Sequence, residues 1–483
     1  MPRKPMGDCV LDGYDPGGFY CEMLRSPATA EIRGRLGRMA IEEFRRRAQG
    51  AEEALYRLGI TFTVYSDSQA IDRILPFDAI PRVLPADEWD HIERGVIQRV
   101  TALNLLLDDL YHEQKILRDG LVPEDLILGN PNWRPAMRGV NIPHKAYVNI
   151  CGTDIIRDEH GTFRVLEDNA RTPSGVSYVI ENRHTMLRSF PDLADDIGLR
   201  SVEDYGIRLV GAMREIAEGN SRGERDDPVI VLLSPGTYNS AYFEHVFLAR
   251  EMGVPLVEGC DLFVDNDRVY MRTTAGRARV DVIYRRINDD FLDPEVFRPD
   301  SMLGVKGLMR AYFAGNVALA NAIGTGVADD KAVYAYMPRI IRYYLGEDPI
   351  LDNVETNICR EKLALAYTLD NLERLVVKPV GEAGGYGITI GPRASRAELD
   401  ECRAKLIDDP ANYISQPCIN LSVSPTLIDG KVEPRHVDLR PFAITGESTW
   451  VLPGGLTRVA LRRGSLVVNS SQGGGSKDTW VLG

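Results

Sequence analysis

Two long stretches near the start of the chain carry apolar residues at the spacing of an amphipathic helix. Residues 24–58 repeat an apolar position every three or four residues up to Gly59, and residues 85–120 do so from Trp89 onward. This spacing lines up apolar side chains on one face of a helix, and that face is then buried. We therefore expect residues 1–140 to be a mainly helical N-terminal region.

Short β-rich runs replace that pattern after residue 140. Residues 146–150 and 162–166 are rich in β-branched and aromatic side chains, and the sequence Asp-Glu-His-Gly at 158–161 is typical of a turn. These runs predict a β-hairpin within a unit that spans residues 141–225.

The register of this hairpin decides which polar side chains share a face. The turn pairs Asp154 with Val165, and side chains alternate along a strand. We therefore expect one face to carry Asp154, Glu167, Asn169 and Arg171. Carboxylate and amide oxygens suit Mg²⁺, which needs only a few protein ligands when phosphate and water complete its shell. A polar, solvated strand edge is the alternative of equal weight.

A separate α/β pattern begins after the sequence Asp-Asp-Pro at 226–228. Runs at 229–233, 254–257 and 280–284 predict strands, and residues 241–252 predict an amphipathic helix between the first two. The alternation of strand and helix is typical of a parallel sheet. We expect a small central α/β domain over residues 226–300.

The last part of the chain combines lysines with a Gly-rich turn. Helical spacing at 303–321 leads to Lys331, and Lys378 ends a predicted strand directly before the Gly-rich turn at 381–387. A return strand at 388–390 makes this a hairpin whose backbone N–H groups could cover phosphates. An ordinary Gly-rich hairpin and a surface lysine are the alternatives. The chain has neither a Walker sequence nor the HRD and DFG motifs of protein kinases.

Composition narrows the choice of partners. The chain has 483 residues, 44% of them hydrophobic, which suggests a globular protein of two to four domains. Its formal charge of -13 argues against nucleic acid as a partner, because binding to phosphate backbones needs a basic surface. We expect no nucleic-acid partner.

Compartment and redox state are predicted from what the sequence lacks. The N-terminal residues have no apolar signal region, and no apolar run is long enough to cross a membrane. Seven cysteines form no CxxC pair and are read as reduced thiols. We expect a cytoplasmic protein without a membrane partner.

The motifs and their order resemble a known family. Asp-Lys at 330–331, Val-Lys-Pro at 377–379 before the Gly-rich turn, a hinge at 413–417 and Glu-x-Asn-x-Arg at 167–171 are together similar to an ATP-grasp ligase. The metal motif comes last in ordinary members and first here. The chain therefore resembles the circularly permuted ATP-grasp proteins related to glutathionylspermidine synthetase and eukaryotic-type glutathione synthetase. The resemblance implies a permuted ATP-grasp fold of the α/β (α+β) class, with its nucleotide-binding part at 301–483.

The resemblance also implies a role for each matching residue. ATP and Mg²⁺ are the expected cofactors, and either Arg171 or Arg440 would stabilise the transferred phosphoryl group. The other implied residues are Lys331 and Lys378 for phosphate, Gly384, Gly385 and Gly387 for the flap, Gln416 for adenine, and Asp154, Glu167 and Asn169 for metal. Gln416 departs from the more frequent Glu of this position.

The implied reaction joins a carboxylate to an amine through an acyl phosphate. The substrates would be small molecules or peptides, bound at the carboxyl ends of the central strands, where open α/β sheets bind ligands. Candidate substrate residues there are Asn239, Ser240, Arg285 and Arg286, and an ion pair with a neighbouring aspartate is an equal alternative for the arginines. A nucleotide-binding pseudo-ligase and an ATP-dependent phosphotransferase are the rival functions, and homo-oligomer formation is left open.

Overall fold

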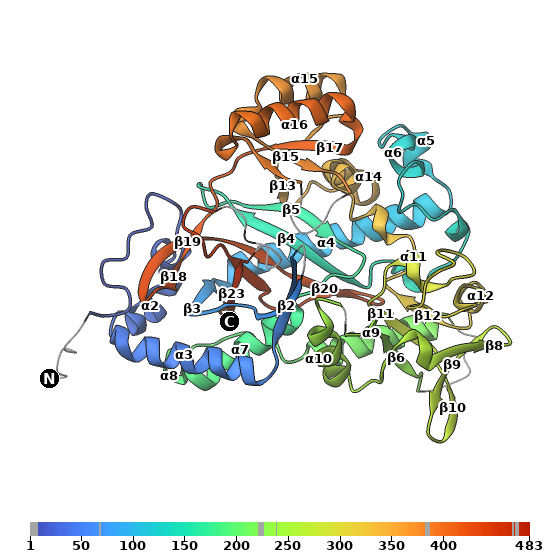
Figure 1. Ribbon diagram of the computed structural model, residues 1–483, viewed down its shortest axis with the longest axis horizontal. Coiled ribbons are helices and arrows are strands. Elements are labelled where there is room, and N and C mark those ends of the chain that lie inside the picture. The colour runs from blue at the N-terminus through green and yellow to red at the C-terminus, as the bar shows by residue number, and fades with distance from the viewer. Residues whose placement is uncertain are drawn as a thin grey trace.

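The computed structural model describes residues 8–66, 69–220, 227–237, 239–381, 387–465, 468 and 473–483. Figure 1 shows a subdomain with α15 and α16 at the top, a large sheet in the middle, and a small α/β unit at the lower right. The N-terminal helices lie along the lower left edge of the large sheet.

The first predicted helical stretch is broken into α1 (Glu22–Arg25), α2 (Ala30–Leu36) and α3 (Ile41–Arg57). Pro27 starts a short 3-10 helix after α1, and α2 ends where the Gly37 N–H donates to a carbonyl of its last turn. The helical spacing persists within α3, whose buried face consists of Phe44, Ala48, Ala51 and Leu55.

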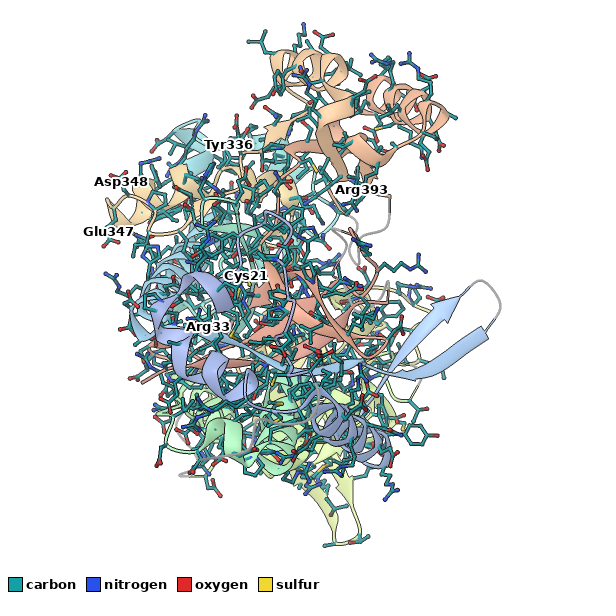
Figure 2. All side chains as sticks on the ribbon, turned by 90° about the vertical axis from the view of Figure 1, so that its left-hand side faces the viewer. Cys21, Arg33, Tyr336, Glu347, Asp348 and Arg393 are labelled. Carbon is teal, nitrogen blue, oxygen red and sulfur yellow. The ribbon has the colours of Figure 1, made fainter. Side chains whose placement is uncertain are left out.

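The second stretch forms the long helix α4 (Ala86–Tyr111), which ends at Tyr111 rather than near Gly120 as predicted; the separate short helix α5 (Lys115–Arg118) follows it. Between α3 and α4 the chain also contains the hairpin β1 (Thr61–Ser66) and β2 (Gln69–Ile74), followed by β3 (Phe77–Leu84). Figure 2 shows that hairpin reaching out from the body. All eight residues of β3 are buried, although Asp78 and Arg82 interrupt its apolar pattern. These two charged residues are the reason the sequence does not read as a buried strand.

The largest sheet of the described residues has ten strands. Its central order is β13-β5-β4-β19-β22-β23-β3, with β18 beside β19 and the β20–β21 pair beside β4. The strands not yet placed are β4 (Ile150–Arg157), β5 (Phe163–Asn169), β13 (Asp352–Asn353), β18 (Val423–Ile428), β19 (Lys431–Arg440), β20 (Phe442–Thr445), β21 (Thr449–Val451), β22 (Leu456–Val459) and β23 (Gly475–Val481). Segments from both ends of the chain therefore share one sheet.

The predicted β4–β5 hairpin is confirmed, but its predicted register is wrong. Ile155 lies opposite Val165, and after a bulge Asp154 lies opposite Glu167 rather than Val165. The bulge places one extra residue, Leu166, on β5. Leu166 packs into a small apolar cluster with Ile156, Val354 and Leu421. Before the bulge the observed register already differs by one residue from the predicted one, since Ile155 rather than Asp154 lies opposite Val165, and the bulge adds one more residue.

Helices cover both faces of the large sheet. On one face, Arg99 of α4 forms a buried ion pair with Asp168 of β5. On the other face, Asn182 of α7 (Val176–Ser189) donates a hydrogen bond to Ser476 of β23. Because adjacent residues of a strand point to opposite faces, Glu167 points away from α4.

The central α/β unit has the predicted parallel sheet, in the order β12-β11-β6-β7. It is built from β6 (Ile230–Leu233), α10 (Tyr242–Met252), β7 (Leu256–Val257), β11 (Val282–Arg285) and β12 (Ala318–Ala320). An antiparallel meander, β8 (Leu262–Asp265), β9 (Arg268–Thr273) and β10 (Gly276–Arg279), is inserted before β11.

The predicted helix over 303–321 is confirmed only in its middle part. Only α12 (Leu308–Phe313) is helical, and the chain turns at Gly315, whose φ of 70° lies in the left-handed region. It then enters β12, the edge strand beside β11. The buried run Val317–Ala320 is too short to distinguish a strand from a helix by spacing alone.

The upper subdomain, residues 357–417, has its own sheet and its own apolar core. Its elements are β14 (Asn357–Ile358), α15 (Lys362–Asp370), β15 (Leu375–Pro379), β16 (Thr389–Ile390), α16 (Arg396–Asp408) and β17 (Tyr413–Pro417). Figure 2 shows it standing clear of the body, with Arg393 at its lower edge and Tyr336 at the junction. Tyr336 donates a hydrogen bond to Glu361 of the subdomain, 3.2 Å away.

The remaining helices connect these parts. They are α5 (Lys115–Arg118), α6 (Glu124–Leu128), α8 (Pro191–Ala194), α9 (Tyr205–Asn220), α11 (Asp289–Leu292), α13 (Lys331–Ala335) and α14 (Met337–Leu345). None of the helices in the described part of the chain is both long enough and apolar enough to cross a bilayer.

Candidate active site

Two carboxylates face each other across neighbouring strands of the large sheet. Asp154 of β4 is fully buried and lies opposite Glu167 of β5, which is about a third exposed. Burial raises the pKa of the Glu167 carboxyl, and the nearby negative charge of Asp154 raises that pKa further. A cation placed between the two carboxylates would relieve this repulsion.

Two arginines already hold Asp154. The Arg440 guanidinium donates from Nη2 to Oδ2 at 2.8 Å and from Nε to Oδ1, while Arg458 Nη2 donates to Oδ2 at 2.6 Å. Burial alone would raise the pKa of Asp154, but the two guanidinium groups outweigh it and hold the pKa below its ordinary value. Asp154 therefore stays ionised while its partner Glu167 is the harder of the two to ionise.

Lysines from two distant segments reach the same carboxylates. Lys331 is the first residue of α13 and places its Nζ 3.7 Å from Glu167 Oε2. Lys378 comes from β15 of the upper subdomain. Its pKa is lowered to about 8, mainly by burial and in part by the charge of Lys331, while the charge of Glu167 opposes the shift. The metal motif and both predicted phosphate lysines thus form one charged cluster.

Asp330 and Asp329, which precede Lys331, have structural partners. Asp330 caps α13 by accepting from the Ala332 N–H at 2.8 Å. Asp329 accepts from the backbone and side chain of Arg171, with the Arg171 N–H at 3.1 Å. This pairing joins the segment after β5 to the segment before α13, which carries Lys331. Arg171 lies beyond the end of β5 and is partly exposed.

The residues fit a magnesium ion bound together with phosphate. The Asn169 side-chain amide donates to the Gly152 carbonyl at 3.1 Å, and no described residue donates to its Oδ1, which lies on the same strand as Glu167. Among the described residues no three His, Cys, Asp or Glu side chains are grouped as a metal site. Two carboxylates and one amide oxygen are nevertheless enough for Mg²⁺ when phosphate oxygens supply the other ligands.

The structure describes the two strands of the Gly-rich hairpin but not residues 382–386 between them. The hairpin is present, with Val377 opposite Thr389, but Gly384 and Gly385 lie outside the described residues. Gly387 has a φ of 71°, a conformation that favours glycine. At the hinge, Gln416 is buried in β17 and donates to Thr356 Oγ1 at 2.9 Å. The roles of these residues stay predictions.

The predicted substrate arginines are buried and paired in the structure. Arg285 donates to the carbonyls of Asn321 and Ala322 and forms an ion pair with Asp289 at 2.8 Å, the alternative weighed from the sequence. Arg286 forms an ion pair with Glu244 at 3.0 Å. It also donates a hydrogen bond at 2.7 Å to the carbonyl of Pro173, which lies in the loop after β5. Arg286 therefore braces the end of β11 against this loop, whereas Arg285 ties β11 to the segment that follows β12.

The other predicted substrate residues lie at the start of α10. The Asn239 side chain accepts a hydrogen bond from the Ala241 N–H at 2.9 Å, and both Asn239 and Ser240 are partly exposed. They follow β6 at its carboxyl end, as predicted. A substrate role for them stays a prediction.

Lys477 of the C-terminal segment is part of the core. Its Nζ forms an ion pair with Asp78 and donates to the Pro425 carbonyl at 2.7 Å. This lysine therefore ties β23 to β3 and β18. Residues 469–472 lie outside the described part, so the loop before it is not assigned a role.

Arg458 and Asp438 have roles that the sequence did not reveal. Arg458 of β22 lies opposite Asp438 of β19 and binds both Asp438 and Asp154. Side chains alternate along a strand, so Asp438 and Arg440 lie on the same face of β19. This spacing is the one feature of the sequence that could have indicated a role for Asp438 beside Arg440. Nothing in the sequence links β22 to β4, because that contact depends on the strand order of the sheet.

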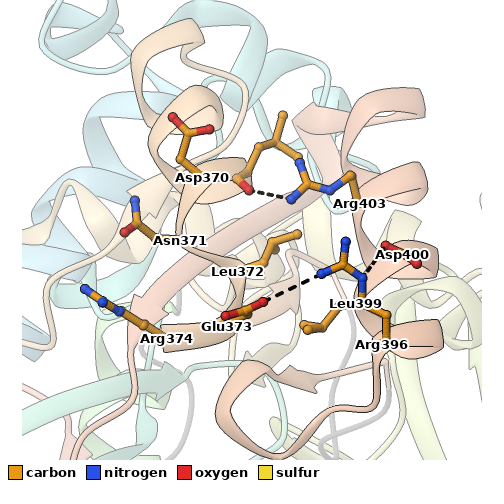
Figure 3. Close-up of a pocket in the computed structure, with 10 residues that line it drawn as sticks. Asp370, Asn371, Leu372, Glu373, Arg374, Arg396, Leu399, Asp400 and Arg403 are labelled. Carbon is orange, nitrogen blue, oxygen red and sulfur yellow. Dashed lines mark hydrogen bonds and ion pairs between the residues drawn. The ribbon is translucent and has the colours of Figure 1, made fainter.

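The upper subdomain also carries a pocket, formed by residues other than those of the Asp154–Glu167 cluster. This pocket has a volume of about 290 Å³ and is lined by charged residues of α16 and of the turn before β15. Figure 3 shows Arg396 paired with Glu373 and Asp400, and Arg403 bonded to the Leu369 carbonyl. Its charged side chains are exposed, and none of them belongs to the Asp154–Glu167 cluster.

Comparison with known proteins gives the family of the chain. Residues 81–460 match the model of the circularly permuted ATP-grasp type 2 family. The chain is 51% identical over 478 residues to an uncharacterized protein of Synechocystis, covering 98% of each. It is 50% identical over 491 residues to an uncharacterized protein of Mycobacterium tuberculosis, covering 99% of this chain and 88% of that one. The chain belongs to the circularly permuted ATP-grasp type 2 family.

Two further similarities concern fold and length. A glutathione synthetase-like effector of Globodera pallida aligns with a TM-score of 0.57 at 11% identity, covering 90% of this chain and 96% of that one. This likeness shows the fold alone. A Frankia casuarinae protein, provisionally named glutamate–cysteine ligase 2-2, is 43% identical over 424 residues. The match covers 88% of this chain but only 48% of that protein, so the chain spans about half of its length.

Proposed function

We propose that the protein is an ATP- and Mg²⁺-dependent ligase that joins a carboxylate to an amine. The observation that carries this proposal is the meeting of Glu167, Lys331 and Lys378, which come from three separate segments, in one cluster. Two lysines beside paired carboxylates can hold a triphosphate and its metal ion together. Membership of the ATP-grasp family supports the same use of the cluster.

The chain's own groups would act mainly by position and charge. Lys331 and Lys378 would bind phosphate oxygens, and Asp154, Glu167 and Asn169 would hold Mg²⁺, which when bound neutralises charge on the transferred phosphate. The substrate carboxylate would attack the γ-phosphate, giving an acyl phosphate and ADP. An amine would then attack the acyl carbon and release phosphate. Arg171 and Arg440 are the candidates to stabilise the phosphoryl oxygens.

The substrate class is proposed as an amino acid or small peptide. The provisional name of the Frankia relative and the glutathione synthetase-like fold support an amino-acid-like carboxylate. Fold alone does not fix a substrate, so the class has to be found by experiment.

We expect ADP release that requires an acid and an amine together. A panel of amino acids, dipeptides and polyamines would be assayed in pairs for ADP, and the product identified by mass spectrometry as the sum of both substrates minus water. ADP formed with an amine-free acceptor, and a phosphorylated product, would identify a phosphotransferase instead. Nucleotide binding without ADP release from any pair would identify a pseudo-ligase.

Nucleotide affinity should fall as the pH rises through about 8. The pKa of Lys378 is lowered to about 8, so this lysine is charged below that pH and loses its charge above it. A neutral amine binds phosphate less well, so the affinity for metal-free ADP should decrease from about pH 7 toward about pH 9.5, a range in which the phosphates of ADP stay ionised. Calorimetric titrations across this range would measure it. The Lys378→Arg variant, which stays charged, should show a flat profile; an equal decrease in that variant would contradict the assignment.

A further inference from the structure

The two oxygens of the buried Asp154 carboxylate have different partners. Among the residues that the structure describes, Oδ1 accepts a hydrogen bond only from Arg440 Nε, whereas Oδ2 accepts one from Arg440 Nη2 at 2.8 Å and one from Arg458 Nη2 at 2.6 Å. The oxygen shared with Arg458 is therefore held on two sides. Oδ1 depends on Arg440 alone.

The two arginines also differ in how firmly they are fixed. Arg458 is anchored by Asp438, which lies directly opposite it and accepts from its Nε at 2.9 Å, and both residues are fully buried. Arg440 ends β19 at the edge of the site and is more exposed, and its remaining contact is a long hydrogen bond of 3.3 Å to the Ser174 carbonyl. Arg440 is therefore the partner that can leave.

A buried carboxylate without a counter-ion is strongly destabilising, so Asp154 needs a permanent positive partner. Arg458 supplies it whether or not Arg440 is in place. If Arg440 turns toward a phosphoryl group, Oδ2 stays bound to Arg458 and Oδ1 loses its hydrogen bond to Arg440.

We propose that Arg458, held by Asp438, is a positioning residue that orients Asp154 so that Oδ1 faces the metal ion. Arg440 occupies this oxygen when no metal is bound and exchanges with the metal. Residues that orient a metal ligand typically change metal affinity by about 10- to 100-fold when replaced. The inference rests on the proposed function, since it requires a site for a metal–nucleotide complex.

The test is the affinity for Mn²⁺ in the presence of saturating ADP, measured by electron paramagnetic resonance. We expect Arg458→Lys to weaken Mn²⁺ binding by about 10- to 100-fold while the affinity for metal-free ADP stays within about twofold of wild type. The matched control is Arg183→Lys. Arg183 forms an equally buried pair with Asp478 on the same sheet, at 2.9 Å, but does not touch Asp154.

The outcomes separate the inference from the proposed function. Unchanged Mn²⁺ affinity in Arg458→Lys, or an equal loss in Arg183→Lys, would overturn the positioning role. If Arg458→Lys does not fold, Asp438→Asn removes the anchor instead and should weaken Mn²⁺ binding in the same direction; unchanged affinity there would also overturn it. Wild-type protein that binds no Mn²⁺ with ADP would refute the proposed function itself.

Discussion

The Glu167→Gln variant is expected to lose about 100- to 1,000-fold in the rate of ADP formation, as is typical when one preorganised charged group is removed. Glutamine keeps the shape of Glu167 but removes its charge from the position opposite Asp154. Burial and Asp154 already oppose ionisation of this carboxyl, so a neutral replacement should be tolerated by the fold. The rate would be measured with the best acid and amine pair at saturating Mg-ATP.

Glu159→Gln is the matched control for that variant. Glu159 lies in the turn of the same hairpin and is exposed, so its replacement should leave both rate and stability unchanged. A Glu167→Gln variant that retains wild-type turnover would show that this carboxylate takes no part in holding the metal.

The Lys378→Ala variant is expected to bind Mg-ATP about 10- to 100-fold more weakly. A hydrogen bond to a charged group contributes about 1.5–3 kcal/mol, and a tenfold change in affinity corresponds to about 1.4 kcal/mol. Lys378 of β15 is a candidate for such a bond, because its charge interacts with those of Glu167 and Lys331. Calorimetric titration would measure the affinity. The exposed Lys405 of α16, replaced by Ala, serves as control and should leave it unchanged.

The order of motifs in the sequence was enough to predict the permuted fold. Local signals placed Glu167 on a hairpin and Lys378 before a Gly-rich turn, and both positions are confirmed. The parallel central sheet followed from alternating apolar runs and one amphipathic helix. These features depend on neighbours in sequence, which is why periodicity and turn residues reveal them.

Features that depend on distant contacts could not be predicted in the same way. Leu166, the extra residue of the bulge, packs against Val354 and Leu421, and the bulge sets Asp154 opposite Glu167. The hold of Arg458 on Asp154 requires β22 to lie two strands from β4, which only the strand order provides. Similarly, β12 reads as the end of a helix until its pairing with β11 is known.

The central claim is that Glu167 and Lys378, which are far apart in the chain, hold one Mg-ATP molecule. Calorimetric titration of Mg-ATP into wild type, Glu167→Gln and Lys378→Ala tests it most directly. The claim predicts one binding site per chain in the wild-type protein, weaker Mg-ATP binding in both variants, and loss of the magnesium dependence in Glu167→Gln. Absence of Mg-ATP binding to wild type, or unchanged affinity and magnesium dependence in both variants, would contradict it.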